Sequence, residues 1–158
     1  INAATYSFWR NKDYDASADG GTAATTANIQ TYMNRLWLEC VRGPDKPDLL
    51  LADSLYYALF WGSLQAIQRI NDPARGVAGY KSVGFESADV VYEDNTGMPA
   101  SHMYFLNSDY LFLRYAPRRL FKPLERVQSI NQDAIAQLIT FAGNMTCSNR
   151  SLQGVFHS

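Results

Sequence analysis

Hydrophobic and polar positions alternate most regularly between residues 26 and 70, where they predict two helices joined by a short strand. In the first of these segments the apolar residues recur at intervals of three and four, which places them on one face of an α-helix. These residues are Ile29, Tyr32, Met33, Leu36, Trp37, Cys40 and Val41. We expect a helix from Thr26, as its N-cap, to Arg42, because Gly43-Pro44 is typical of a helix end.

Residues 48–52 (DLLLA) form an apolar run that is too short for a helix. Such a run predicts a strand that is covered on both faces. Asp53 or Ser54 can cap the helix that follows, and this helix is expected to end at Asn71-Asp72-Pro73. Its predicted buried face carries Tyr56, Phe60, Leu64 and Ile67. The strand and the helix together form the centre of the expected core.

The hydrophobic pattern changes to a period of two after residue 81, which indicates strands. We expect strands at 82–85, 88–92, 102–107, 110–115 and 151–156. Residues 135–147 are apolar and β-prone, with Gly143-Asn144 expected to interrupt them as a bulge or bend. The chain is therefore predicted to be an α+β protein.

Composition narrows the class of protein. With 158 residues, of which 47% are hydrophobic, the chain is long enough for one domain with an ordinary core. A net charge of -1 gives no overall field toward nucleic acid or an anionic membrane. No run approaches the ~20 apolar residues of a membrane span, and no signal peptide is recognisable. Cys40 and Cys147 lack a motif spacing and are expected to be buried free thiols.

Two charged segments are candidates for binding. Asp89, Glu93 and Asp94 lie close together, and a solvated turn explains them better than a cation site or an acid/base pair, because no ligand set accompanies them. A basic segment runs from 114 to 126. It contains Arg114, Arg118, Arg119, Lys122 and Arg126, with Tyr115 and Phe121 among them. Either a nucleic-acid patch or an intersubunit salt-bridge loop would have this composition.

Residues that could carry catalysis are few. Neither His102 nor His157 has a cysteine or carboxylate at metal-ligand spacing, and the two are too far apart in the sequence to indicate a relay. No glycine-rich phosphate loop follows the strand at 48–52, where Ala52-Asp53-Ser54 leads directly into the helix. We therefore expect no catalytic residue, no metal and no cofactor.

Several stretches resemble a known family. They are KPDLLLAD at 46–53, MYFLNSDYL at 103–111, NQDA at 131–134, GNMTCSNR at 143–150, QG at 153–154 and FWRN at 8–11. Together they resemble the C-terminal half of the major capsid proteins of tailed bacteriophages and prophages. The resemblance implies the Hong Kong 97-type coat fold. In that fold an axial domain, with helices flanking a small mixed sheet, surrounds the axis of a hexamer or pentamer, and a long strand returns to a peripheral domain.

The resemblance also implies how the chain is divided. Residues 1–25 would be a linker leading into the fold, residues 26–130 the axial domain, and residues 131–158 the return strand and a final strand. Such a protein is a structural component of the virion. It assembles in the bacterial cytoplasm from copies of itself into an icosahedral shell around DNA, which it would contact without sequence specificity. Coat proteins have no catalytic residues to transfer, so no enzymatic activity is expected.

In a ring of identical subunits each interface is head-to-tail, so the acidic segment of one subunit would meet the basic segment of the next. The expected interface residues are Asp89, Glu93, Asp94, Arg114, Tyr115, Arg118, Arg119 and Phe121. A different class of function remains open from the residues alone. A small-molecule-binding or hydrolytic α+β domain could use the junction at Ala52-Asp53-Ser54.

Overall fold

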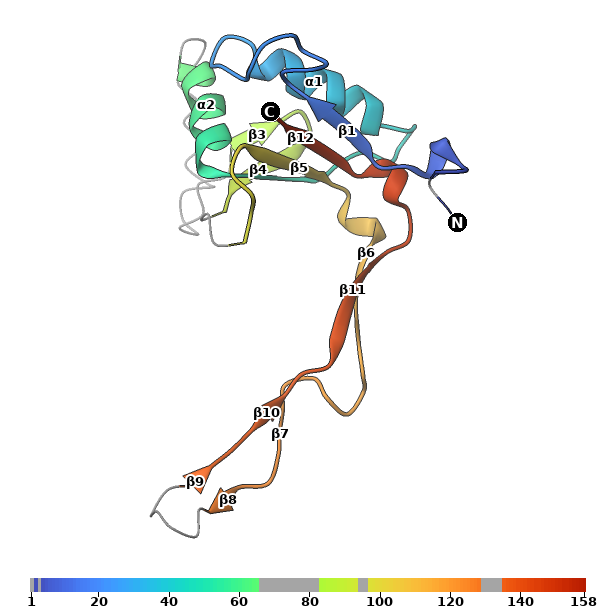
Figure 1. The fold of residues 1–158 in the computed structure, drawn as a ribbon, viewed down its shortest axis with the longest axis vertical. Helices are drawn as coiled ribbons and strands as arrows, with labels where there is room; N and C mark the ends of the chain where they lie inside the picture. The colour runs from blue at the N-terminus through green and yellow to red at the C-terminus, as the bar shows by residue number, and fades with distance from the viewer. Residues whose placement is uncertain (1, 3, 66–82, 94–96, 129–134) are drawn as a thin grey trace. The chain divides into compact units, whose positions relative to one another are not determined.

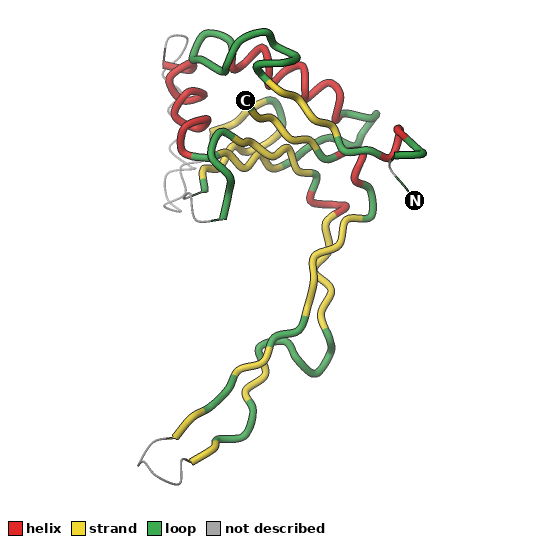
Figure 2. Tube along the Cα trace, viewed as in Figure 1, coloured by secondary structure: helices red, strands yellow, loops and turns green. Residues whose placement is uncertain are grey.

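The computed structural model of the chain describes residues 2, 4–65, 83–93, 97–128 and 135–158. The chain divides into two compact units. The first contains residues 1–108 and 149–158, and the second contains residues 109–148. In the described residues the first unit holds two α-helices and a six-stranded sheet, whereas the second contains paired strands and no α-helix (Figures 1 and 2).

The sheet of the first unit has the strand order β1-β12-β5-β2-β4-β3. Its strands are β1 (Lys12–Asp15), β2 (Leu49–Ala52), β3 (Val83–Phe85), β4 (Ala88–Tyr92), β5 (His102–Leu106) and β12 (Gly154–His157). The central strand β2 pairs parallel with β4 and antiparallel with β5. The strands expected at 48–52, 82–85, 88–92, 102–107 and 151–156 are therefore confirmed within a few residues.

Strand β1 lies at an edge of the sheet, where it pairs parallel with β12, and the sequence did not predict it. Only Tyr14 of its four residues is buried. A short edge strand with charged residues has too little apolar alternation to be recognised, and charges on an edge discourage pairing with other chains.

Helix α1 (Ile29–Cys40) buries the six residues of the predicted stripe that it contains. It begins two residues later than expected, so the prediction of Thr26 as N-cap is wrong. The N-cap is Asn28, whose side-chain oxygen accepts a bond from Thr25 N at 2.6 Å and makes none to the helix. Helix α2 (Ser54–Gln65) buries Tyr56 and Phe60 as predicted. Its expected end at 71–73, and Ile67, lie outside the described residues.

Both helices pack against one face of the sheet. Side chains that alternate along paired strands, such as Leu50, Phe105 and Val90, are fully buried on this face. Aromatic contacts join helix and sheet, among them Tyr56 with Phe156 at 4.8 Å between ring centroids. On the other face of β2, Leu49 and Leu51 are only half-buried, so the prediction of a strand covered on both faces is wrong.

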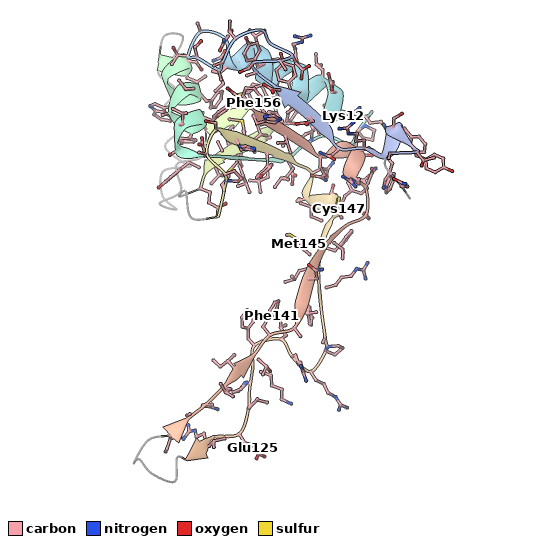
Figure 3. All side chains as sticks on the ribbon, viewed as in Figure 1. Lys12, Glu125, Phe141, Met145, Cys147 and Phe156 are labelled. Carbon is pink, nitrogen blue, oxygen red and sulfur yellow. The ribbon has the colours of Figure 1, made fainter. Side chains whose placement is uncertain are left out.

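The second unit is an antiparallel hairpin, which we call the β-ribbon (residues 109–148). Strand β6 (Leu111–Tyr115) pairs with β11 (Gly143–Cys147), β7 (Lys122–Pro123) with β10 (Ile139–Thr140), and β8 (Val127–Gln128) with β9 (Ile135–Ala136). Figure 3 shows Cys147, Met145, Phe141 and Glu125 in succession along it. The basic segment at 114–126 is therefore one side of a paired hairpin.

The interruption in the last part of the ribbon lies elsewhere than expected. Gly143 and Asn144 belong to β11 and pair with Tyr115 and Arg114, so the predicted bend at these residues is wrong. The regular pairing stops instead at 141–142, opposite a loop of residues 116–121. Extra residues in one strand of an antiparallel pair produce such a local excursion.

Three further features complete the description of the fold. Short 3-10 helices occur at η1 (Ser7–Trp9), η3 (Ser108–Tyr110) and η4 (Arg150–Leu152). Cys40 and Cys147 are both free thiols, as predicted, but only Cys40 is buried. Cys147 is exposed because it lies on the β-ribbon, which has no interior. Among the residues described, no helix has the length and apolar character needed to cross a membrane.

Candidate subunit interface

The β-ribbon exposes most of its apolar side chains. Of the 18 large hydrophobic side chains that are exposed in the described residues, 12 belong to this unit, and none of its described residues is buried. A two-stranded hairpin is at best marginally stable in water by itself. Contiguous exposed apolar surface of this kind marks a site of contact with another protein segment. The ribbon therefore leaves its apolar side chains exposed, and its described residues form no core of their own.

The paired strands β6 and β11 give this part of the ribbon two different faces. Side chains alternate between the faces, and the register places Leu113 opposite Met145 and Tyr115 opposite Gly143. Leu111 and Cys147 belong to the same apolar face. Leu113 is 56% exposed and Met145 66% exposed. The sequence predicted a strand at 110–115, and its pairing with β11 shows that one apolar face extends over both strands.

The opposite face of β6 and β11 carries polar side chains beside Phe112. Arg114 donates from Nε to Thr146 Oγ1 at 3.2 Å, and its guanidinium carbon lies 6.0 Å from the centre of the Phe112 ring. Thr146 Oγ1 in turn donates to the carbonyl oxygen of Phe112 at 3.3 Å. These bonds hold Arg114 across the two strands. Arg114, one of the predicted interface residues, therefore makes contacts within the ribbon that link its two strands.

The loop of residues 116–121, which we call the arginine loop, carries Arg118 and Arg119 with their side chains exposed. It is fixed at its base by three backbone bonds, from Ala116 N to Ala142 O, from Arg119 N to Ala116 O and from Ala142 N to Arg119 O, each of 2.9 Å. Phe121 closes it with φ of 46°, and its ring stacks on Phe141 with centroids 5.0 Å apart. The loop therefore presents two arginines on a braced backbone.

The structure places the predicted acidic residues that it describes in the first unit and the predicted basic and aromatic ones on the β-ribbon. Asp89 is half-buried within strand β4. The prediction of a solvated turn is therefore wrong for this residue. Glu93 is exposed directly after β4. Asp94 lies outside the described residues. Arg114, Tyr115, Arg118, Arg119 and Phe121 are brought together on the ribbon.

A group of aromatic residues on the first unit was not predicted from the sequence. The rings of Tyr57 and Trp61 stack with centroids 6.4 Å apart and an interplanar angle of 21°, and Tyr92 lies 5.7 Å from Tyr57. Trp61 is 43% exposed and Tyr92 51% exposed. We call these three residues the aromatic platform. The sequence of α2 did contain an indication of this surface. The helix is apolar on all sides, so some of its apolar residues cannot face the sheet and must lie on a second surface.

The junction at Ala52-Asp53-Ser54 has a structural role. Asp53 is buried, and its Oδ1 accepts a bond from Tyr56 N at 2.7 Å, which caps α2. Its Oδ2 accepts a bond from Ser101 N at 2.6 Å. Both carboxylate oxygens are thus bonded to backbone N–H groups. This geometry supports a helix cap that ties down the 97–101 loop, and it gives no support to a ligand site at the junction.

The two histidines meet in the fold, although the sequence separates them. His102 and His157 are opposite each other in the β5–β12 register, with ring centroids 5.4 Å apart. His157 Nε2 lies 3.0 Å from Asp13 Oδ1, and His102 Nδ1 lies 2.8 Å from Ala100 O. The reasoning that sequence separation keeps them apart is therefore wrong. Within the described ranges, no three His, Cys, Asp or Glu side chains are grouped so that they could hold a metal ion.

Comparison with known proteins gives a match at the level of structure. No known protein-family model matches the sequence, and no curated protein sequence does either. A chain from Mycobacterium phage Che8 matches 94% of this chain and 54% of its own length, with a TM-score of 0.64 and 11% identity. An encapsulin from Synechococcus elongatus PCC 7942, solved as the holo-SrpI complex, matches 92% of this chain and 52% of its own, with a TM-score of 0.56 and 13% identity.

A virus-like particle from Pyrococcus furiosus is similar over 93% of this chain and 56% of its own, with a TM-score of 0.55 and 13% identity. The chain spans about half the length of each of these proteins. At these identities the likeness shows the fold alone. The chain has the α+β fold of Hong Kong 97-type capsids and encapsulins, as the sequence resemblance implied.

Proposed function

We propose that this chain is part of the major capsid protein of a tailed phage or prophage, which assembles from copies of itself into hexamers and pentamers that form an icosahedral shell around DNA. The observation that carries the proposal is the β-ribbon, a paired hairpin with exposed apolar side chains and no core. The fold shared with a phage chain, an encapsulin and a virus-like particle supports it. So does the sequence resemblance to phage coat proteins.

Burial of the ribbon would supply the energy of assembly. Each large apolar side chain that is fully buried contributes about 1.5–3 kcal/mol, and the apolar face offers Leu111, Leu113, Tyr115 and Met145 to a partner. Only part of this becomes affinity, because ordering and docking consume much of the gain. In a closed ring the same contact recurs at every interface, so a modest contact suffices for a stable assembly.

Charge would set the orientation of the contact. The β-ribbon has five Lys and Arg against three Asp and Glu, whereas the rest of the chain has nine against twelve. Unlike charges on two parts of one chain favour a head-to-tail arrangement. We propose that Asp89, Glu93 and Asp94 face the basic residues of a neighbouring subunit. Exposed pairs contribute only about 0–1 kcal/mol each, so they select the partner more than they hold it.

The test uses two neighbouring residues that point to opposite faces of the same strand. Met145→Glu puts a charge on the apolar face, and Asn144→Glu puts the same charge on the polar face. Expressed as the complete gene product and viewed by electron microscopy, Asn144→Glu should form shells, and Met145→Glu should remain as smaller species. Normal shells from Met145→Glu would contradict the role of the ribbon. A wild-type product that remains monomeric would contradict the proposed function.

The arginine loop provides a second test. Arg118→Glu combined with Arg119→Glu should leave the chain folded, because both side chains are exposed, but should block capsomers or shells. Circular dichroism checks folding, and electron microscopy at physiological salt checks assembly. Normal shells would rule out these residues as interface residues. Normal shells that lack DNA would instead indicate that the loop contacts the packaged nucleic acid.

We propose a purely structural role, without catalytic turnover. The histidine pair is the nearest approach to a catalytic group among the described residues, because Asp13 lies against His157. A hydrolytic activity that is lost in both His102→Ala and His157→Ala, while the fold is retained, would contradict this part of the proposal.

A further inference from the structure

We propose that the aromatic platform of Tyr57, Trp61 and Tyr92, together with Glu93, binds the arginine loop of a second copy of this chain. The inference rests on the proposed shell function and names the partner surface for the loop. It adds a site on helix α2 and the end of β4 that the charge pattern of the sequence did not indicate.

The platform has the properties of an anchor site for a protein partner. Tyr57 lies between Trp61 and Tyr92, so three rings from two separate elements form one continuous surface. About half of each outer ring is exposed. Trp and Tyr are among the residues that most often dominate binding energy at protein interfaces, because they bury large rigid surfaces at low entropic cost.

An arginine side chain is the ligand that this surface suits. Guanidinium groups stack on the faces of Trp and Tyr rings, and they pair with carboxylates through fixed donor geometry. Glu93 follows Tyr92 directly in the chain and is exposed, with its Oε1 2.9 Å from the point where a Cβ on Gly97 would stand, so a negative charge lies one residue from the platform in the sequence. A nucleic acid would also stack on aromatic rings, but its phosphates would meet the carboxylate of Glu93.

The arginine loop supplies the complementary group. Arg118 and Arg119 are adjacent and exposed on a backbone held by hydrogen bonds, so their positions are partly ordered before binding. Leu120 is 41% exposed and Phe121 67% exposed, and they can pack beside the rings as the guanidinium groups stack. Five basic residues on the ribbon and an acidic excess on the rest of the chain make the contact electrostatically favourable. Both surfaces are present on every copy, so the contact can repeat head-to-tail.

Disulfide crosslinking between two distinguishable copies tests the contact directly. One complete gene product carries Tyr92→Cys, the other carries Arg118→Cys with a different affinity tag, and both carry Cys147→Ser to remove the exposed thiol. Oxidation of the mixed assembly should give a disulfide-linked pair containing both tags. The matched control replaces Tyr92→Cys by Leu38→Cys, at a position 74% exposed on α1, and should give at least tenfold less of the linked pair.

A charge exchange tests the same contact without crosslinking. Glu93→Arg should raise the protein concentration needed for shell formation by about tenfold or more, and Glu93→Arg combined with Arg118→Glu should largely restore it. Trp61→Ala should raise the required concentration with Glu93 intact. Equal crosslinking by the Tyr92→Cys and Leu38→Cys variants, or no restoration by the exchange, would overturn the inference. If wild-type shells still form, the proposed function survives that result. If wild-type chains form no shells, the proposed function itself fails.

Discussion

Leu36→Ala tests the core that the sequence and the structure both assign to α1. Leu36 is fully buried, and both of its methyl carbons lie 3.3 Å from the point where a Cβ on Gly154 would stand. The side chain is therefore pressed against the backbone of β12. This strand is paired on both sides, with β1 and with β5, so it cannot move inward to fill a void.

Buried Leu→Ala substitutions cost about 2–5 kcal/mol of unfolding free energy, and the cost rises where the surroundings cannot collapse. We therefore expect a loss in the upper half of this range. Urea unfolding measures it as a lower midpoint with an unchanged slope. Leu38→Ala, at a position 74% exposed on the same helix, serves as the control and should change the free energy by less than about 0.5 kcal/mol.

A loss below about 0.5 kcal/mol for Leu36→Ala, or equal effects of the two substitutions, would refute the assigned helix face. Gly154→Ala gives an independent check from the other side of the contact. Its new methyl group would lie 2.8 Å from Cys40 Sγ, which is too close, and overpacking of this kind costs about 1–3 kcal/mol.

Three further predictions concern Asp53, the two cysteines and Tyr56. Asp53→Ala should lower the free energy of unfolding, measured with urea, by roughly 2–4 kcal/mol, because it removes the cap of α2 and leaves the N–H of Ser101 without its acceptor. Asp53→Asn keeps one oxygen and should lower it by less; equal losses would contradict the role of both oxygens. A thiol reagent should modify Cys147 alone in the native protein and Cys40 only on unfolding, since burial raises the pKa of Cys40 to about 12; two reactive thiols in the native state would contradict this. The free energy of unfolding should fall as the pH rises above about 9. In the unfolded chain Cys40 and Tyr56 lose protons near their ordinary pKa values of 9.0 and 10.0, whereas burial in the folded protein raises both pKa values to about 12. A midpoint of urea unfolding that stays constant from about pH 8 to about pH 11 would contradict this prediction.

Local sequence patterns predicted the parts of this protein whose environment repeats at short range. The spacing of apolar residues identified α1 and its buried face, since one helix face packs on one sheet face and the period of burial appears directly in the sequence. The apolar run at 48–52, which is too short for a helix, identified the central strand, but it wrongly indicated that both faces of that strand are covered. The sequence also predicted interface residues among the arginines and aromatics of 114–121, which the structure shows to be exposed, but it did not predict how they are arranged.

The tertiary structure decided what depends on pairing between distant segments. Strand β1 exists because β12 accepts it, and residues 111–128 form a ribbon because residues 135–147 pair with them, neither of which leaves a local period. Register brought His102 to His157, and packing of α2 beside β4 brought Tyr57 to Tyr92. Long-range pairing is set by the free energy of the whole fold, so a residue's own neighbours in the sequence do not reveal which distant side chain it will meet.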